Sequence, residues 1–467
     1  NMAPFVELEW GPQATEIMWR IKQLADPDGV LAPGVVLNRD PGCHLANLKT
    51  TPEVEESVTA CVECGFCEPV CPSRDLTTTP RQRIVLRREM ARQPAGSPVL
   101  EALASEFVYD GLDTCAVDGS CALACPLGID TGKLVKELRA AAHGPRTARA
   151  AELTSDRWHA VERAGRAALR AGAEDGAVGP RAMARATAVA RRVTGPDVVP
   201  AWVEPMPRAA EMDGRISPPP AEPAAVYMPS CTNRIFGTGG VDRGAVSLPA
   251  ALAAVSERAG MPVLIPDEVA GTCCGTPQGS KGFPSAQARK LEETVERLWS
   301  WTREGALPVV VDATSCTHGL IEGAELLSDA GRERHAQLEI VDSIEWGRRL
   351  LPNLSVAERL GSITVHPTCA SRKLGLDGAL AELAGALAGE VRVPASANCC
   401  GFAGDRGFLH PELTAAALAP EAAEVAAAPS DAYVCANRTC EIGLRRETGQ
   451  DYGSIIHLLE RRTRPGS

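Results

Sequence analysis

Residues 61–72 read CVECGFCEPVCP, which places four cysteines at C-x2-C-x2-C-x3-C-P spacing. This is the spacing of iron–sulfur ligand runs, in which three thiolates wrap one cluster and the fourth ligates a neighbouring cluster. Pro72 fixes its own φ and has no amide proton, so the loop ends there and a helix can begin nearby. Zinc is the alternative metal, but zinc sites usually use two C-x2-C pairs separated by a longer stretch. The run therefore predicts an iron–sulfur cluster.

A second run, CAVDGSCALACP, occupies residues 115–126 and has Asp118 in place of the second cysteine. In such paired runs, the last cysteine of each run ligates the cluster of the other run; we call this the crossover rule. It assigns four cysteines to cluster 1, namely Cys61, Cys64, Cys67 and Cys125. It assigns three cysteines to cluster 2, namely Cys71, Cys115 and Cys121. Asp118 is a candidate oxygen ligand of cluster 2. A hydroxide ligand or a three-iron (3Fe-4S) cluster are the other options at that corner. Alternatively, Asp118 is a turn residue before Gly119.

The composition is that of an acidic globular protein. At 467 residues, the chain is long enough for about three domains. Its net charge of -11 argues against nucleic-acid binding, which usually leaves a basic footprint. No apolar run reaches the roughly 18 residues of a membrane-spanning helix. The 17 cysteines are clustered and no signal peptide is visible, so we expect a cytoplasmic protein that uses them for metal or redox chemistry.

Helices are expected beside both runs, at 79–93 and 131–142. Thr79 is a favourable N-cap and Pro80 a favourable first helical residue. The first of these helices carries a row of arginines, namely Arg81, Arg83, Arg87 and Arg88. The row predicts either a solvated helix face or a positive charge beside an anionic cluster.

The C-terminal half of the chain repeats itself. YMPSCTNR at 227–234 matches VHPTCASR at 365–372, TCCG at 272–275 matches NCCG at 398–401, and TSCTHGL at 314–320 matches RTCEIGL at 438–444. Each repeat thus offers four candidate ligands, Cys231, Cys273, Cys274 and Cys316 in repeat 1 and Cys369, Cys399, Cys400 and Cys440 in repeat 2. Repeat 2 adds Cys435. The recurrence predicts metal or redox function, with iron–sulfur clusters, zinc and disulfide exchange as the options.

Short apolar runs alternate with helical stretches in both repeats. The expected strands lie at 225–228, 262–265 and 307–312, and again at 363–365, 391–393 and 432–434. Helices are expected between them, for example at 247–259 and 285–301. This alternation predicts α/β domains with mainly parallel strands, whose ligands bind at the carboxyl ends of the strands. Four of the cysteines follow strands directly, so we expect each set to converge at one sheet edge.

The two repeats resemble the cysteine-rich CCG domains of heterodisulfide reductases and of the iron–sulfur subunits of glycolate oxidase and anaerobic glycerol-3-phosphate dehydrogenase. The family pattern ends in C-x2-C, whereas here Gly319 follows Cys316 at that spacing and Gly443 follows Cys440. Each repeat therefore lacks one thiolate of the pattern, which leaves its cluster type open. Together with the two cysteine runs, the resemblance covers roughly residues 52–462.

The N-terminal residues indicate one branch of this group. Residues 20–34, RIKQLADPDGVLAPG, resemble the closing segment of FAD-linked oxidases of the vanillyl-alcohol oxidase type. A flavin part fused to an iron–sulfur half is similar to the bacterial respiratory D-lactate (D-2-hydroxyacid) dehydrogenases, in which an Asp-Gly pair like Asp118-Gly119 is also usual. We expect the chain to be a fragment that lacks most of the FAD domain, with the flavin and substrate residues upstream of Asn1.

The predicted fold class is α+β and multidomain, with a small α-helical two-cluster ferredoxin-like domain followed by two repeated α/β CCG domains. The predicted parts are an FAD-linked oxidase remnant (1–45), the 4Fe-4S ferredoxin-type helical domain (46–145), a helical segment with a proline-rich linker (146–222), repeat 1 (223–350) and repeat 2 (351–467). The two runs predict two 4Fe-4S clusters, the second alternatively 3Fe-4S. The CCG repeats are candidates for further clusters.

The resemblance implies electron transfer from FAD to a quinone or cytochrome acceptor, with a small 2-hydroxyacid as substrate in the missing FAD domain. It also implies peripheral contact with the inner face of the cell membrane. Three alternatives stay open. One is the iron–sulfur component of a glycolate oxidase or glycerol-3-phosphate dehydrogenase. The others are a heterodisulfide reductase-like thiol redox protein and a non-enzymatic scaffold whose repeats bind zinc.

Overall fold

The computed structural model describes residues 2–46, 48, 51–211, 220–238 and 246–465. The chain forms two compact units, Asn1–Glu53 and Val54–Ser467. Both cysteine runs and both repeats belong to the second unit. The arrangement is α+β and multidomain, which confirms the predicted fold class.

The N-terminal unit is built on helix α1 (Ala3–Ala25). Gly11 breaks the helical backbone with φ +78°, directly before Pro12. The helix ends at Asp26, whose carboxylate accepts hydrogen bonds from the amides of Val30 and Leu31 at 2.8 and 2.9 Å. This turn folds the following loop back toward the end of the helix.

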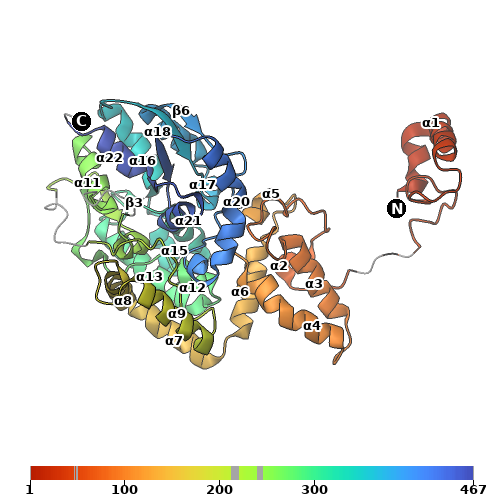
Figure 1. Cartoon of the computed structure of the whole chain (residues 1–467), viewed down its shortest axis with the longest axis horizontal. Coiled ribbons are helices and arrows are strands. Elements are labelled where there is room, and N and C mark those ends of the chain that lie inside the picture. The colour runs from red at the N-terminus through yellow and green to blue at the C-terminus, as the bar shows by residue number, and fades with distance from the viewer. Residues whose placement is uncertain (1, 47, 49–50, 212–219, 239–245, 466–467) are drawn as a thin grey trace. The chain divides into compact units, whose positions relative to one another are not determined.

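The cysteine runs lie in a small helical domain (Figure 1). Its elements are α2 (Glu56–Thr59), α3 (Pro80–Arg92), α4 (Pro98–Phe107), the π-helical turn η1 (Val108–Asp113), α5 (Ser120–Ala124) and α6 (Thr131–Ala142). The predicted start of α3 is confirmed, because Thr79 and Gln82 form a capping box. Val58, Ile84 and Leu134 form the buried core of this domain.

The π-helical turn η1 positions the start of the second cysteine run. Such turns are rare and leave carbonyl groups open to other donors. The Arg83 Nε donates to the Gly111 carbonyl at 2.8 Å. The Arg139 Nη2 donates to the carbonyls of Leu112 and Cys115 at 2.5 and 3.1 Å. Side chains from α3 and α6 thereby fix the backbone that leads into the run.

Three helices connect the helical domain to the repeats, namely α7 (Pro145–Asp156), α8 (Trp158–Gly172) and α9 (Pro180–Thr194). Helix α7 packs on α13 (Pro284–Trp301) and α8 packs on α10 (Cys231–Ile235), both in repeat 1. Residues 195–211 continue without a further helix. The proline-rich linker expected at 217–223 lies partly outside the described residues.

Two α/β repeats follow. Repeat 1 contains β1 (Ala225–Met228), α10, α11 (Leu248–Arg258), β2 (Val263–Leu264), η2 (Asp267–Val269), α12 (Thr276–Ser280), α13, β3 (Val309–Val311), α14 (Thr314–Glu322), η3 (Gly323–Leu326), α15 (Asp329–His335), β4 (Ile340–Asp342) and α16 (Ser343–Leu350). Repeat 2 contains η4 (Leu351–Asn353), β5 (Leu360–Val365), α17 (Cys369–Lys373), α18 (Asp377–Leu387), β6 (Ala388–Arg392), α19 (Arg406–Leu409), α20 (Pro411–Ala427), β7 (Ala432–Cys435), α21 (Arg438–Thr448), β8 (Tyr452–Ser454) and α22 (Ile455–Arg462).

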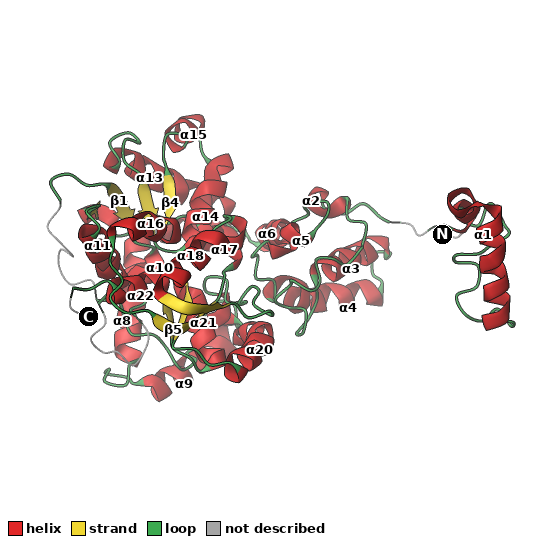
Figure 2. Cartoon of the chain, turned by 90° about the horizontal axis from the view of Figure 1, so that it is seen from above, coloured by secondary structure: helices red, strands yellow, loops and turns green. Residues whose placement is uncertain are grey.

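The two sheets have the same topology. Their strand orders are β2-β1-β3-β4 and β6-β5-β7-β8, and every pairing is parallel. Figure 2 shows them as two separate groups of strands surrounded by helices. The repeat in the sequence is therefore a repeat of structure, and the prediction of parallel strands is confirmed.

All six predicted strands are present, but two others are not anticipated by the sequence pattern. Strands β4 and β8 read IVD and YGS, so neither contains an apolar run like the three valines of β3. Strand β6 begins at Ala388, ahead of the predicted apolar run, because its first residues pair with β5 through the backbone. Each of these strands lies at the edge of its sheet.

The two repeats share one hydrophobic core, to which α11 of repeat 1 and α22 of repeat 2 both contribute. Polar contacts also join the carboxyl ends of their strands. The Oγ1 atoms of Thr314 and Thr368 lie 2.8 Å apart. The Arg438 Nε donates to the Asn233 Oδ1 at 2.9 Å. The sheet edges that carry the cysteines therefore face each other.

Candidate metal centres

Four cysteines of the helical domain line a single cavity. They are Cys61, Cys64 and Cys67 of the first run and Cys125 of the second. The crossover rule assigns these same four residues to cluster 1. Ile84 and Arg81 also line the cavity, so its wall combines thiols, apolar groups and one cation. This donor set fits an iron–sulfur cluster, which needs thiolate ligands and a largely dry surrounding.

The other three cysteines of the runs gather around Arg83, whose side chain is 1% exposed. The Arg83 Nη1 donates to the Cys71 Sγ at 3.7 Å. Burial works against the guanidinium charge, but the negative charges of Cys115, Cys71 and Cys121 outweigh it and raise the pKa of Arg83. Burial raises the pKa of Cys115, and the two nearby arginines oppose that shift. A buried cation among thiolates fits an anionic cluster.

The arginines of α3 fall into two groups. Arg81 and Arg87 are partly exposed and pair with glutamates. Arg83 and Arg88 are buried, and Arg88 donates to Glu63 and to two backbone carbonyls near the first run. The prediction of a solvated face is wrong for Arg83 and Arg88, because the cysteine loops offer acceptors that draw both side chains inward.

The four cysteines of repeat 1 converge at the carboxyl edge of its sheet. Cys231 begins α10, Cys316 lies in the first turn of α14, and the adjacent Cys273 and Cys274 precede α12. All four are buried. Hydrogen bonds between neighbouring thiols, together with burial, raise the pKa of Cys273 and of Cys316. The Cys274 sulfur receives two of these hydrogen bonds, which lower its pKa.

Gly319 stands where the CCG pattern has a further cysteine. A Cβ at Gly319 would lie 3.6 Å from the Cys274 Sγ but only 2.2 Å from the Thr276 Oγ1. The Cys274 Sγ and the Thr276 Oγ1 are 3.2 Å apart. The Thr276 hydroxyl therefore fills the space of the missing side chain, and repeat 1 offers oxygen where the pattern has sulfur.

Repeat 2 brings its cysteines together in the same way. Cys369 begins α17 and Cys440 lies in the first turn of α21. The Cys400 and Cys440 sulfurs are hydrogen-bonded at 3.1 Å, and Cys399 is hydrogen-bonded to Cys369. Cys435 ends β7 and donates its thiol to a backbone carbonyl at 3.5 Å. Cys435 therefore has a structural role at the end of its strand, whereas the other four thiols of repeat 2 lie together as candidate ligands.

Repeat 2 also contains a buried histidine that repeat 1 lacks. His366 matches Met228 of repeat 1, and its Nδ1 lies 2.9 Å from both carboxylate oxygens of Glu421. Burial opposes the charged imidazole, but Glu421 outweighs burial and raises the pKa of His366. The Nε2 has no hydrogen-bond partner among the described residues. The Cys440 hydrogen bond, and then the His366 charge, lower the pKa of Cys400. In the sequence, the His-Pro-Thr-Cys motif at residues 366–369 is the signal that points to this histidine.

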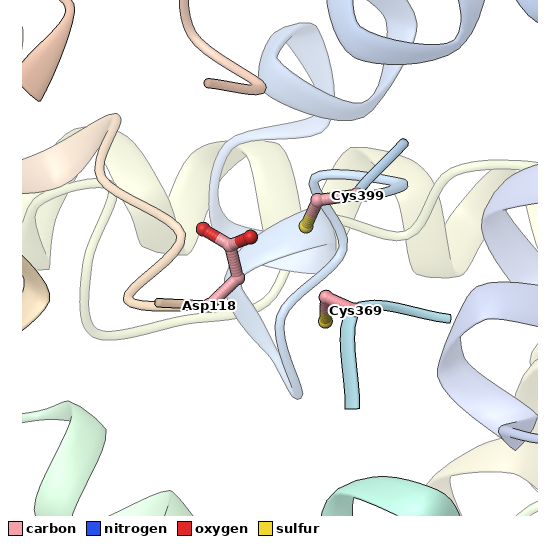
Figure 3. A group of neighbouring side chains, drawn as sticks. All are labelled: Asp118, Cys369 and Cys399. Carbon is pink, nitrogen blue, oxygen red and sulfur yellow. The ribbon is translucent and has the colours of Figure 1, made fainter. Parts of the chain in front are cut away.

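The carboxylate of Asp118 lies beside repeat 2. One of its oxygens and the sulfurs of Cys369 and Cys399 all lie within 4.8 Å of one another. Figure 3 shows the three side chains grouped together, with the carboxylate beside the Cys399 thiol. Asp118 accepts a hydrogen bond from the Ser120 amide at 3.3 Å, which is the geometry of the predicted turn. Burial raises the pKa of Cys121, and negative charges that include Asp118 add to the shift. Ligation of cluster 2 by Asp118 stays a prediction.

A charged network between the helical domain and repeat 2 has no signal in the sequence. The Asp197 Oδ1 lies 2.8 Å from the Arg406 Nη1 and 2.9 Å from the His410 Nε2. Burial raises the pKa of the neighbouring Asp113 to about 6. Burial lowers the pKa of His410, but hydrogen bonds to Asp197 and Glu412 outweigh it and raise the value to about 9. Because Arg406 already supplies the cation, we assign an ion network rather than a metal site.

Comparison with known proteins identifies the same modules. The family model of the 4Fe-4S dicluster domain matches residues 57–129, and that of the cysteine-rich (CCG) domain matches 226–321 and 363–445. The model of the C-terminal domain of FAD linked oxidases matches residues 1–36. The chain is 25% identical over 218 residues to Lactate utilization protein A of Oceanobacillus iheyensis, in an alignment that covers 44% of this chain and 86% of that protein.

The chain therefore combines an iron–sulfur dicluster domain with two cysteine-rich CCG domains. Its thiols lie in the groups described above, with buried cations beside those of the helical domain. These findings support iron–sulfur clusters and an electron-transfer role of the oxidoreductase type. The support for flavin is a short match at the N-terminus.

Proposed function

We propose that this chain is the iron–sulfur electron-transfer portion of a flavin-dependent D-lactate (D-2-hydroxyacid) dehydrogenase. It passes electrons from FAD to a quinone or cytochrome acceptor. The observation that carries the proposal is the continuous series of thiol groups in one compact unit, from the cavity of cluster 1 to both repeats. The likeness to a lactate utilization protein supports lactate as the substrate class. The flavin and the D configuration rest on the resemblance of residues 20–34.

Contacts between residues link the successive thiol groups. The first run ends at Cys71, which lies with cluster 2 beside Arg83. The second run carries Asp118, which lies against the cysteines of repeat 2. The contact between Thr314 and Thr368 then joins repeat 2 to repeat 1. Iron–sulfur clusters supply one-electron transfer when bound, and the chain holds their ligands in a row that can relay it.

Charged residues around the thiols affect how readily the clusters accept electrons. Arg83 and Arg139 bring positive charge into a buried region, which offsets the negative charge of thiolate ligands. The buried pair of Arg234 and Glu162 does the same beside the thiols of repeat 1, because the guanidinium also faces Cys231. The charge and burial around each cluster help to set its reduction potential.

The acceptor and the membrane contact are further parts of the proposal. Across the described parts of the chain, no helix is both long enough and apolar enough to cross a bilayer. We place the protein in the cytoplasm, with peripheral contact at the inner face of the cell membrane, where a quinone or a cytochrome accepts the electrons. The 2-hydroxyacid binds in the flavin part and not to the residues described here.

The test uses the intact protein, purified anaerobically with its flavin. D-lactate, L-lactate, glycolate and glycerol 3-phosphate are added in turn, and absorption of the flavin and of the iron–sulfur clusters is followed. We expect D-lactate to bleach both, and a quinone analogue or cytochrome to restore the colour. Reduction by glycolate or glycerol 3-phosphate alone would favour the related enzymes instead. Absence of bound flavin would refute the proposal.

A heterodisulfide reductase-like thiol redox protein is the second candidate. The contact between the Cys400 and Cys440 sulfurs at 3.1 Å favours it, because two thiols at that distance can form a disulfide after small movements. Thiol–disulfide exchange would then replace hydroxyacid oxidation. Mass spectrometry of the oxidised protein under denaturing conditions distinguishes the two, since a reversible Cys400–Cys440 disulfide that forms without loss of iron supports the second candidate.

A further inference from the structure

We propose that Asp118 of the helical domain is an oxygen ligand of the metal centre of repeat 2, beside the thiolates of Cys369 and Cys399. The inference rests on the proposed iron–sulfur function, because it requires a metal in repeat 2. It assigns Asp118 to a different centre from cluster 2, to which the spacing of the run assigns it. The helical domain and repeat 2 then share one centre.

The three side chains have the geometry of a metal site. Their ligand atoms lie within 4.8 Å of one another, and Figure 3 shows the three side chains grouped together. Carboxylate oxygens bind such metals at about 2.0–2.2 Å and thiolates at about 2.3 Å, so the ligand atoms of one tetrahedral site lie roughly 3.5–3.8 Å apart. Small rotations of the Asp118 and cysteine side chains close the remaining difference. Donors from two domains are therefore close enough to bind one ion after small movements.

An apolar cluster, rather than a free loop, holds Asp118 in this position. Ala116 of the second run packs with Cys399 and Leu413 of repeat 2, and Leu76 and Cys369 pack around them. Helix α5 contacts α17 at the same interface. Burial of these apolar groups orients the second run against repeat 2. The carboxylate therefore reaches the thiols because of tertiary packing.

The backbone before Asp118 has a conformation that the first run uses to present a ligand. Val117 has φ +51°, in the left-handed region that β-branched residues avoid. Glu63, at the same place in the first run, has φ +60° and precedes Cys64, which lines the cavity of cluster 1. Position 118 is thus built as a ligand position, at a cost in backbone strain. In the second run, the side chain presented there meets repeat 2.

Gly119 allows the two domains to approach closely. A Cβ at Gly119 would lie 2.3 Å from the Lys373 Nζ of α17 and 3.2 Å from the Asp130 Oδ2. A side chain at Gly119 would have to displace the end of the Lys373 side chain from the second run. Burial raises the pKa of Asp118, while Ser120 and then Lys373 offset part of that shift.

Asp118 also has an oxygen to spare for a metal. The Ser120 amide, at 3.3 Å, and the Ser120 hydroxyl both donate to the Oδ2. Within the described parts of the chain, the Oδ1 receives no hydrogen bond. The two donors orient the carboxylate as supporting groups commonly orient metal ligands. The Oδ2 anchors the side chain, and the Oδ1 can bind a metal.

Repeat 2 obtains no ligand from the position where the CCG pattern has its last cysteine. A Cβ at Gly443 would meet Phe402 and Thr414 carbons, each at 3.0 Å, so that space is already filled by carbon atoms. Asp118 supplies an additional donor from another domain. The equivalent thiols of repeat 1, Cys231 and Cys273, lie beside the cation of Arg234.

The test compares the full chain with Asp118→Asn and Asp118→Cys, all purified anaerobically. Two reference variants mark the centres, Cys399→Ser for repeat 2 and Cys115→Ser for cluster 2. Iron, zinc and acid-labile sulfide per chain are measured for each protein, together with Mössbauer and EPR spectra. Loss of metal to a chelator is timed as a second readout that does not depend on activity.

We expect Asp118→Asn, which keeps the shape of the side chain, to lose the spectral component that Cys399→Ser loses. It should keep the component that depends on Cys115. Its repeat 2 metal should leave to the chelator faster by at least the roughly 10–100-fold typical of losing an outer-shell partner. Asp118→Cys should restore the metal with an altered spectrum, which a purely structural role of the carboxylate would not produce.

Three results would overturn the proposal. The first is that Asp118→Asn alters the spectral component that depends on Cys115. The second is that Asp118→Asn alters neither spectral component. The third is that Cys399→Ser removes no metal. An unsubstituted chain that holds no iron would refute the proposed function itself. An unsubstituted chain with iron in the helical domain only would leave that function standing and refute the shared centre. The two failures are therefore distinguishable.

Discussion

Replacing Arg83 with methionine should lower the reduction potential of cluster 2 and leave that of cluster 1 unchanged. The Arg83 side chain is 1% exposed, and its Nη1 lies 3.7 Å from the Cys71 Sγ. Its other nitrogens donate to the Ser73 Oγ and the Gly111 carbonyl, both at 2.8 Å. The fixed positive charge favours the more negative, reduced state of a cluster beside it. Methionine retains much of the aliphatic volume without the charge.

The size of the shift in reduction potential follows from the distance between the Arg83 charge and cluster 2. Two unit charges about 4–6 Å apart interact by roughly 3–4 kcal/mol at an effective dielectric constant of about 20. The added electron spreads over the whole cluster, so about half of this interaction energy, ~2 kcal/mol, contributes to the change in the reduction potential of cluster 2. For one electron, about 1.4 kcal/mol corresponds to about 59 mV. The expected shift is therefore about 90 mV downward.

A potentiometric titration followed by EPR measures the midpoints of the two clusters separately. Arg83→Lys keeps the charge and should shift cluster 2 much less. Arg81→Met removes a cation from the cavity of cluster 1 and should shift that cluster instead. If Arg83→Met retains its full iron content and the midpoint of cluster 2 does not move, the charge argument is refuted. Equal shifts of both clusters would indicate general loosening of the domain.

Three further changes test the packing around the thiols. Glu162→Gln should lower the free energy of unfolding by about 3–5 kcal/mol, because it leaves the buried Arg234 without its counter-charge; denaturant titrations measure this, and an unchanged midpoint would contradict it. His410→Gln should remove stability that is complete below pH 6.5 and is lost as the pH rises through about 9, the raised pKa of the folded state. A difference in unfolding free energy that is the same on both sides of that range would count against it. Gly319→Ala should destabilise the chain by about 1–3 kcal/mol, since the new Cβ would lie 2.2 Å from the Thr276 Oγ1. Adding Thr276→Ala should restore most of the loss, and no restoration would show that another contact is responsible.

Much of the arrangement could be predicted because its chemistry is local in the sequence. The spacing of the two runs names thiols that the structure brings around one cavity and around Arg83. The internal repeat predicts two similar domains, and both sheets have the same parallel topology. Cys231 and Cys369 follow the first strand of their sheets, so the rule on carboxyl strand ends places them correctly.

Other features depend on contacts between segments far apart in the chain. Asp118 meets Cys399 only because apolar residues of two domains pack together, and no local spacing encodes that contact. The burial of Arg83 depends on the π-helical turn that opens the Gly111 carbonyl to it. The charged network around Asp197 joins three segments that show no common motif. In each case a charged residue, which the sequence alone would place at the surface or in a turn, is brought beside distant residues by tertiary packing.

Iron and acid-labile sulfide per chain, measured after anaerobic purification and combined with EPR of the reduced and oxidised protein, test the electron-transfer role most directly. We predict about seven or eight irons from the two clusters of the helical domain, and more if the repeats are filled. EPR signals should appear on reduction of the protein, and a three-iron signal in the oxidised sample would mean that no ligand holds a fourth iron at the Asp118 corner. Zinc without iron, together with no visible absorption, would contradict the electron-transfer role and favour a structural one.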